Sequence, residues 1–303
     1  MKIFISGALG HIGSYLIKSL PSKIKFSKIY IADNLQTQRY CSLFNLKNHN
    51  YEFLDLDLSK EIPNKDVDLV IHLAAKTDAA QSKIFKKEFE RNLKITTNII
   101  KYCKKYRSKL IFASSTSVYG PQTDVVDENC NVSELNPQSP YATIKLKEEN
   151  LIKKQLKTNN YLILRLGTIY GYSEGIRFQT AVNKFCLQAS LNQPITIWKT
   201  AFNQKRPYLG LDDLSNAITH IIKKNIFNNQ IYNIVSNNYK VSDIVKYIKL
   251  FKKVKIKYVY HPIMNQLSYS VMNKKFTDTN FKFNSNIKKE IQKTLKRLKN
   301  LDN

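Results

Sequence analysis

The feature that most constrains the fold is an alternation of short apolar segments with longer amphipathic ones through the first half of the chain. Runs rich in Ile, Leu, Val, Phe and Tyr are typical of buried strands, and each is followed by a segment long enough for a helix. This alternation favours an α/β fold with a doubly wound parallel sheet. The predicted strands are 2–6, 28–32, 51–54, 69–73, 110–113 and 161–166, with helices at 12–20, 84–106 and 141–156.

The pattern becomes less regular beyond Gly167. A strand at 231–235 is expected to join the main sheet. Further strands are predicted at 194–198 and 255–260, and further helices at 179–190, 242–249 and 287–298. We therefore expect a sheet domain over 1–166 and, mainly over 167–303, a smaller lobe at the carboxyl ends of the strands, where open α/β sheets bind ligands.

The first predicted strand runs directly into the glycine-rich turn GALGHIG (7–13). Glycines at such a turn allow close approach of the backbone to a pyrophosphate, and the amides that open the next helix then face the phosphates. The spacing is one residue longer than the standard dinucleotide fingerprint. His11 is expected to pack within the loop rather than to catalyse. The predicted cofactor-binding residues here are Gly7, Gly10, His11, Ile12 and Gly13.

Asp33 closes the second predicted strand, 20 residues after the last glycine of the turn. A carboxylate at this place can accept the adenosine ribose hydroxyls and would repel a 2′-phosphate, which favours NAD over NADP. Asp57 and Leu58, after the third strand, could cover the adenine, with Asp55 as a competing candidate.

The fourth predicted strand ends in Leu73, Ala74 and Ala75, small or apolar residues that let a backbone approach the cofactor. His72, just before them, lies on an apolar strand and is expected to be a hydrogen-bonded core histidine.

Tyr141 and Lys145 are separated by one helical turn, so both side chains share one face of a predicted helix. A free phenol ionises near pH 10, and an adjacent ammonium favours the phenolate. The pair follows a hydroxyl-rich cluster at 114–117. Together with the glycine turn, these residues can bind a nicotinamide cofactor and move a proton and a hydride.

These motifs resemble those of extended short-chain dehydrogenase/reductases, in the NAD-dependent epimerase/dehydratase family that acts on nucleotide sugars. The resemblance covers the first 171 residues closely and continues more loosely through RPYLGLDD (206–213). The matching motifs are GALGHIG (7–13), DNL (33–35), HLAA (72–75), Asn92 in a helix, SSTSVYG (114–120), YATIK (141–145) and RLGTIYG (165–171).

The resemblance implies a role for each matching residue. Tyr141 would be the catalytic base and acid, and Lys145 would bind the nicotinamide ribose and promote ionisation of the tyrosine. Ser115 would hydrogen-bond the reacting sugar oxygen. Asn34 and Asn92 would belong to the cofactor-binding set.

The two positions after Ser115 separate the reactions of this family. The resemblance implies an Asp-Glu pair there in sugar 4,6-dehydratases and a glutamate at the second position in UDP-glucuronate decarboxylases, whereas this chain has Thr116 and Ser117. The run SSTSVYG instead resembles 4-epimerases, including those acting on UDP-uronates. A ketosugar reductase or dehydrogenase would use the same triad. A dehydratase is less favoured, and a dinucleotide-sensing protein without catalysis is the non-enzyme alternative.

The substrate contacts are less clearly marked. Many epimerases that the chain resembles carry an asparagine where Thr168 stands, and a late arginine that clamps the diphosphate. The only arginine after position 206 is Arg297, in a terminal basic helix. Arg206 resembles the arginine of the family's R-D-Y-like segment and is the preferred phosphate contact here. The other candidates for substrate contacts are Tyr119, Arg177 and Asn183.

Composition limits the remaining possibilities. The formal charge is +26, yet only seven of the 49 basic residues are arginine and they form no cluster, so we expect a lysine-rich surface rather than a specific nucleic-acid site. Four scattered cysteines favour neither zinc nor disulfides and fit a cytoplasmic protein, and no apolar run is long enough to cross a membrane. The resemblance implies a homodimer that pairs through the helices at 84–106 and 141–156.

Overall fold

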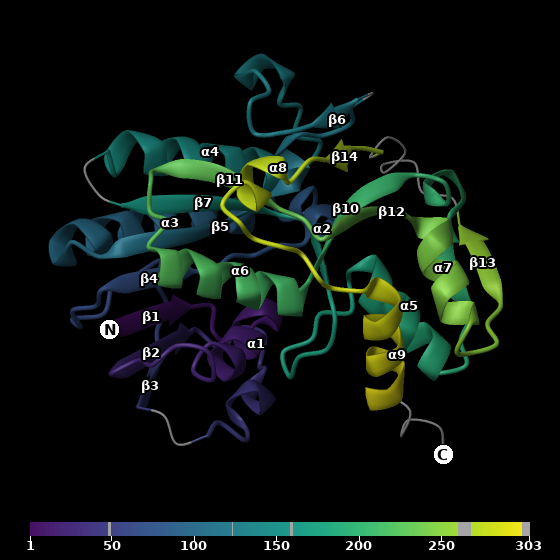
Figure 1. Ribbon diagram of the computed structural model, residues 1–303, viewed down its shortest axis with the longest axis horizontal. Helices are drawn as coiled ribbons and strands as arrows, with labels where there is room; N and C mark the ends of the chain where they lie inside the picture. Colours follow the sequence, from purple (N-terminus) through teal and green to yellow (C-terminus); the bar gives the residue numbers. More distant parts are fainter. Residues whose placement is uncertain (48–49, 123, 158–159, 260–267, 299–303) are drawn as a thin grey trace.

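The computed structural model describes residues 1–47, 50–122, 124–157, 160–259 and 268–298. Within these residues the central sheet has seven strands in the order β11-β7-β5-β4-β1-β2-β3, and all neighbouring pairs are parallel (Figure 1). The strands are β1 (Lys2–Ser6), β2 (Lys28–Asp33), β3 (Tyr51–Asp55), β4 (Leu69–His72), β5 (Lys109–Ser115), β7 (Tyr161–Leu166) and β11 (Gln230–Ile234).

The strand order reverses between β1 and β4, because the chain adds β2 and β3 on one side of β1 and the other strands on the opposite side. Ligands of open α/β sheets bind at the carboxyl ends of the strands beside such a reversal. The glycine turn after β1 and the loop after β4 meet at this point, since Leu73 N donates to Ser6 O over 3.1 Å.

Helices cover both faces of the sheet (Figure 1). Successive residues of a strand point to opposite faces, so Ile3 and Ile5 pack in one core layer and Phe4 in the other. The first layer includes α1 (His11–Ser19) and α6 (Leu211–Lys224). The second includes α3 (Lys86–Tyr106) and α4 (Pro140–Gln155).

A smaller lobe lies beside the carboxyl ends of the strands (Figure 1). Its core is built from three helices packed on short strands. The elements are α5 (Ala181–Ser190), α7 (Val241–Lys249), α9 (Ile287–Arg297), the sheet β8 (Thr168–Tyr170), β10 (Lys205–Gly210) and β12 (Asn237–Lys240), and the pair β9 (Ile195–Trp198) and β13 (Ile256–Val259). The remaining short elements are α2 (Ala79–Ser82), β6 (Val125–Val126), β14 (Ser270–Val271) and α8 (Lys274–Thr277).

The predicted fold class is confirmed, and each of the seven predicted strands of the main sheet is present, including the late one. The helix predicted over 84–106 is wrong at its start, because a separate short helix, α2, ends at Ser82 and α3 begins at Lys86. The strand predicted over 255–260 is β13, and position 260 lies outside the described residues.

Helix α6 was not predicted, although its sequence carries the usual signals. Its buried residues include Leu211, Leu214, Ala217, Ile218 and Ile221, at helical spacing. Acidic residues occupy its first turn and lysines its last, as the helix dipole favours. Both α6 and β11 pack into the layers of the main sheet although they lie well beyond position 166.

Within the described residues, no helix combines the length and apolar character needed to cross a membrane. The same part of the chain contains no group of three His, Cys, Asp or Glu side chains placed to hold a metal ion.

Candidate active site

Ser115 is the last residue of β5 and caps a short 3-10 turn, η2 (Thr116–Val118). Its Oγ accepts a hydrogen bond from Ser117 N over 3.2 Å and lies 2.9 Å from Ser117 Oγ, which donates to it. A hydroxyl has two acceptor positions and one proton. Ser117 therefore fills the acceptor positions of Ser115 and leaves the Ser115 proton for another partner.

Thr116 points into the protein, with 2% of its surface exposed. Its Oγ1 donates to Leu166 O over 3.2 Å and lies 3.3 Å from the hydroxyl of Tyr269. Both positions that follow Ser115 thus carry hydroxyls that are engaged with the protein, and neither supplies an acid or a base.

Tyr141 and Lys145 lie one turn apart at the start of α4. The helix begins sharply because Ser139 Oγ accepts from Ala142 N over 3.2 Å and proline follows the cap. Tyr141 is partly exposed and its backbone N–H donates to Ser82 Oγ over 3.2 Å. Helix α4, which carries Tyr141 and Lys145, packs against both η2 and β5.

Lys145 is almost fully buried, with 3% of its surface exposed. Its Nζ lies 4.5 Å from the centre of the Phe112 ring and 3.1 Å from Glu148 Oε2. The sequence pattern predicts a lysine ammonium beside the tyrosine. The structure adds a carboxylate that offsets part of its charge.

The glycine turn is packed too closely for side chains at two positions. Gly7 has φ +67°, and a Cβ placed on it would lie 2.7 Å from Ala74 N. A Cβ on Gly13 would lie 2.4 Å from Gly7 O. Helix α1 begins after Gly10 with no side-chain cap and no acidic residue in its first turn, which includes His11 and Ile12. Its first amides are therefore open to an anion such as a pyrophosphate.

Asp33 lies at the end of β2, facing the glycine turn. Its Oδ2 accepts from Leu9 N over 3.1 Å and its Oδ1 from Leu35 N over 3.0 Å. Burial raises the pKa of Asp33, and these two amides oppose that shift. Each carboxylate oxygen keeps a lone pair that can accept a ribose hydroxyl. Asn34 next to it accepts from Gln36 N and shapes the turn.

The other predicted cofactor residues surround the same edge. Asp57 accepts hydrogen bonds from Ser59 and pairs with Arg91, whereas Leu58 is buried in the core. Leu73 and Ala74 donate their amides to Ser6 Oγ over 3.2 and 3.3 Å.

Ala75 is partly exposed beside this loop. Asn92 is buried, and its amide group exchanges two 2.9 Å hydrogen bonds with the backbone of Lys76. Asn92, on α3, therefore holds the loop after β4 in place.

A segment of the smaller lobe, the strap (residues 171–177), crosses the glycine turn. Gly175 N donates to Ser14 Oγ over 2.9 Å, and a Cβ on Gly175 would lie 2.3 Å from Leu9 O. At the end of the strap, Arg177 hydrogen-bonds Thr77 and lies 3.8 Å from Asp78, in the loop after β4. The strap is thus attached to both loops that flank the reversal of strand order.

His11 joins the glycine turn to the strap. Its Nδ1 lies 2.8 Å from Ser173 Oγ and its Nε2 lies 3.2 Å from Asn183 Nδ2. Ser173 Oγ also donates to His11 O over 2.9 Å, so the imidazole carries its proton on Nδ1 and accepts at Nε2. Burial lowers the pKa of His11 to about 3, which keeps the ring neutral.

Comparisons with known proteins identify the family of this chain. Residues 3–235 match the model of the NAD dependent epimerase/dehydratase family. The chain belongs to this family. Members of this family depend on NAD, and the open amides of α1 together with Asp33 fit that cofactor.

Two relatives illustrate the range of the family. A dTDP-D-glucose 4,6-dehydratase of Dictyostelium discoideum is 34% identical over 276 residues, which are 80% of this chain and 60% of that protein. An uncharacterized UDP-glucose epimerase of Bacillus subtilis is 31% identical, over 74% of this chain and 73% of its own. The chain thus spans less than two thirds of the dehydratase.

Among solved structures, a mutant UDP-glucuronic acid 4-epimerase from Bacillus cereus, in complex with UDP-4-deoxy-4-fluoro-glucuronic acid and NAD, superposes with a TM-score of 0.87. It is 24% identical and the match covers 99% of this chain and 100% of that one. At this identity the likeness establishes a shared fold.

The predicted substrate residues fall into two groups in this family member. Thr168 and Arg206 are partly exposed and lie on the adjacent strands β8 and β10, where Thr168 is in register with Tyr208. Asn183 and Tyr119 are fully buried and bonded within the protein. Asn183 contacts His11 and the strap, and the Tyr119 hydroxyl donates to Asn233 Oδ1 over 2.9 Å.

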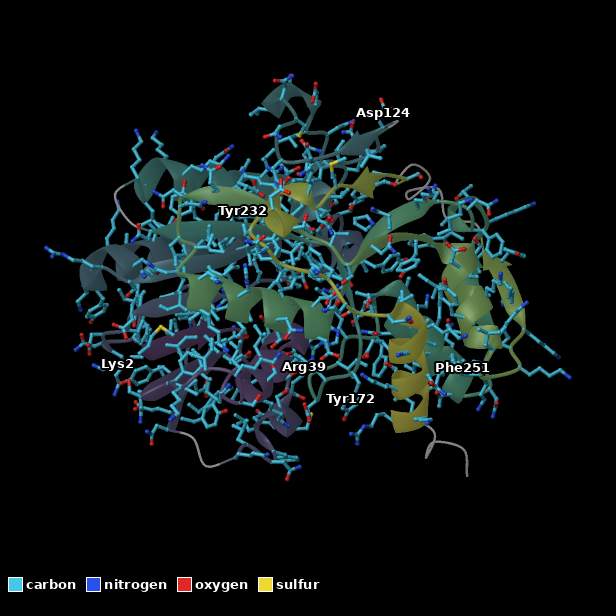
Figure 2. The ribbon with its side chains drawn as sticks, viewed as in Figure 1. Lys2, Arg39, Asp124, Tyr172, Tyr232 and Phe251 are labelled. Atoms are coloured by element: carbon cyan, nitrogen blue, oxygen red, sulfur yellow. The ribbon has the colours of Figure 1, made fainter. Side chains whose placement is uncertain are left out.

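Two further residues at this edge were not identified from the sequence. Arg39 interacts electrostatically with Asp33 and Arg177, and Figure 2 labels it, with Tyr172 of the strap, where the strap passes the glycine turn. Tyr269 is buried, and its phenol interacts electrostatically with both Arg206 and Tyr141. Arg39 lies four residues after the DNL motif, and this spacing could have marked it as a site residue. The sequence around Tyr269 carries no motif that marks it as a site residue.

Proposed function

We propose that this protein is an NAD-dependent nucleotide-sugar epimerase that inverts C4 through a transient 4-keto sugar. The observation that carries the proposal is the arrangement at the end of β5. Ser115 has its acceptor positions filled, Tyr141 and Lys145 follow on the packed helix α4, and the two hydroxyls after Ser115 are engaged with the protein.

In the proposed reaction Tyr141 accepts the proton of the C4 hydroxyl, and Ser115 donates a hydrogen bond to the same oxygen. A bound NAD would supply the hydride chemistry at C4, as the acceptor and later the donor of one hydride. Tyr141 then gives the proton back, so proton and hydride balance over one cycle. An elimination or a decarboxylation would need a further acid or base, which Thr116 and Ser117 do not provide.

The residues proposed to hold NAD are those around the reversal of strand order. The glycine turn and the first amides of α1 would face the pyrophosphate, and Asp33 would accept the adenosine ribose hydroxyls. Asn34, Asp57 and Leu58 would lie toward the adenosine, whereas the loop 73–75, held by Asn92, and Lys145 would lie toward the nicotinamide ribose.

For the sugar nucleotide we propose Thr168 and Arg206 as direct contacts, because both are accessible on adjacent strands. Arg206 would pair with a phosphate. Arg177, at the end of the strap, would be a further substrate contact. Tyr119 and Asn183 are buried and would support the residues that line the site. The lysine-rich net charge of +26 would help to attract an anionic substrate.

The test is an NMR screen of purified protein with NAD against UDP-, GDP- and dTDP-sugars, including uronates. The expected result is a C4 epimer without net accumulation of reduced cofactor, and its absence from a Tyr141→Phe control. Stoichiometric consumption of NAD or NADH would support a ketosugar reductase or dehydrogenase instead. A 4-keto-6-deoxy product would support a dehydratase, and turnover of no sugar would refute the enzyme proposal.

The oligomeric state remains a prediction. The proposed homodimer would pair α3 and α4 of each subunit, and the exposed faces of these helices carry many lysines, such as Lys94, Lys101 and Lys147. Light scattering at low and high salt tests the dimer, because like charges across such an interface would weaken it at low salt.

A further inference from the structure

A buried carboxylate adjoins the predicted triad and was not part of it. Glu148 lies on α4, one turn after Lys145, and has no exposed surface. Its Oε2 is 3.1 Å from Lys145 Nζ, and its Oε1 accepts from Thr96 Oγ1 over 2.5 Å. An ionised carboxylate is costly to bury unless charges and donors surround it. The groups around Glu148 must therefore offset the cost of burying its carboxylate.

The hydrogen bonds on its other side form a continuous chain across three more elements, α3, β4 and β1. Thr96 Oγ1 of α3 lies 3.2 Å from His72 Nε2, and His72 Nδ1 lies 2.7 Å from Ser6 Oγ at the end of β1. Ser6 Oγ in turn accepts the amides of Leu73 and Ala74. The chain thus runs from Glu148 to the loop that follows β4.

The positions of the protons in this chain follow from donor and acceptor counting. Because two amides fill the acceptor positions of Ser6, its hydroxyl donates to His72 Nδ1. Burial and the nearby Lys145 lower the pKa of His72 to about 3, so the neutral ring carries its proton on Nε2 and donates to Thr96. Thr96 then donates to Glu148. All the hydroxyl and imidazole protons of the chain therefore point toward the carboxylate and stabilise its negative charge.

The contact between Lys145 and Glu148 is at ion-pair distance, but among the described residues none donates a hydrogen bond of good geometry to Glu148 Oε2. The ammonium is therefore attracted by charge while its three protons are not all committed to the carboxylate. Such an arrangement fixes the place of the ammonium and leaves donors for other acceptors, such as ribose hydroxyls.

We propose that Glu148 is a positioning residue that holds Lys145 for cofactor binding, and couples it through Thr96, His72 and Ser6 to the loop 73–75. The inference deepens the proposed function, on which it rests for its kinetic consequence. Its central test uses NAD binding, which requires no sugar substrate. The two proposals can therefore fail separately.

The experiment is a double-mutant cycle on the apoprotein, with the dissociation constant of NAD measured by calorimetry. Glu148→Gln removes the charge and keeps the shape, and is made with Lys145 present and in a Lys145→Met background. We expect NAD binding to weaken roughly tenfold with Lys145 present and by less than about twofold without it, since contacting residues couple. An equal loss in both backgrounds would overturn the proposal.

Glu149 provides a matched control, because it is equally buried on the same helix but pairs with Arg165 instead of Lys145. The effect of Glu149→Gln on NAD binding should be the same in both Lys145 backgrounds. Should Glu148→Gln not fold, Thr96→Val removes the donor to Glu148 and replaces it in the cycle. Coupling of Thr96→Val to Lys145 supports the proposal, and strict additivity contradicts it.

Discussion

The buried ion pair between Arg165 of β7 and Glu149 of α4 offers the sharpest stability prediction. Arg165 Nε donates to Glu149 Oε1 over 3.0 Å, and Arg165 Nη2 donates to Glu149 Oε2 over 2.7 Å. The side chain of Arg165 is 3% exposed and that of Glu149 is 0% exposed. Ser114 Oγ donates to the same carboxylate over 2.5 Å, and the guanidinium carbon lies 4.8 Å from the centre of the Tyr119 ring. The pair is fully desolvated on both sides.

Arg165→Met leaves the Glu149 carboxylate buried with only the serine as a partner. Breaking one side of such a pair costs about 3–5 kcal/mol, because an uncompensated charge remains in the interior. The double variant Arg165→Met/Glu149→Leu removes both charges and leaves the Ser114 hydroxyl without its acceptor, at about 1–3 kcal/mol. We therefore expect the double variant to be more stable than the single one.

Urea unfolding followed by circular dichroism and by fluorescence measures these differences, provided that the two transitions coincide. Lys2→Met is the control, since it breaks an exposed pair with Asp66 and should leave stability almost unchanged. The reasoning is refuted if Arg165→Met stays within about 1 kcal/mol of the native protein. It is also refuted if the double variant is no more stable than Arg165→Met.

Three further predictions concern the site. Gly175→Ala forces a methyl group against the glycine turn at 2.3 Å from a carbonyl oxygen and should destabilise the protein by about 1–3 kcal/mol in thermal unfolding. Ser117→Ala frees an acceptor position on Ser115 and should lower kcat about 2- to 10-fold with KM little changed. Ser117→Thr retains the hydroxyl and should lower kcat less. An equal loss of kcat in the two variants would contradict this role of Ser117. His11 and His72 have pKa values lowered by burial from 6.5 to about 3, so the unfolded chain binds more protons below pH 6.5. Stability should fall by about 1.4 kcal/mol per pH unit for each histidine as the pH drops from 6.5 toward 3, and His11→Asn should make the fall in Tm shallower.

The parts of the fold that the sequence predicts are those determined by local pattern. The apolar strands of the main sheet, the glycine turn and the helix that carries Tyr141 and Lys145 each have a signal within a few residues. Asp33 could be placed because it follows the second predicted strand, and Ser115 because the run SSTSVYG resembles a family motif; in the structure each residue ends a strand.

Features that depend on contacts between distant segments could not be predicted in this way. The Glu148 chain joins residues of α4, α3, β4 and β1, and no local spacing connects them. Asn183 has the position of a substrate contact in the sequence, but the fold places it against His11, 172 residues away. Such pairings arise only when the lobe packs on the sheet.

The place of β11 has a consequence for how the protein is made. Strand β11 is hydrogen-bonded to β7 at the end of the sheet, yet it is translated long after β7, following β8, α5, β9 and β10 of the smaller lobe. At typical elongation rates of about 5–20 residues per second, β7 waits seconds on the ribosome with an unpaired edge. A truncated chain ending at residue 166 would keep that edge permanently. Aggregation of such a fragment, and chaperone dependence of the nascent chain, follow from this order of synthesis.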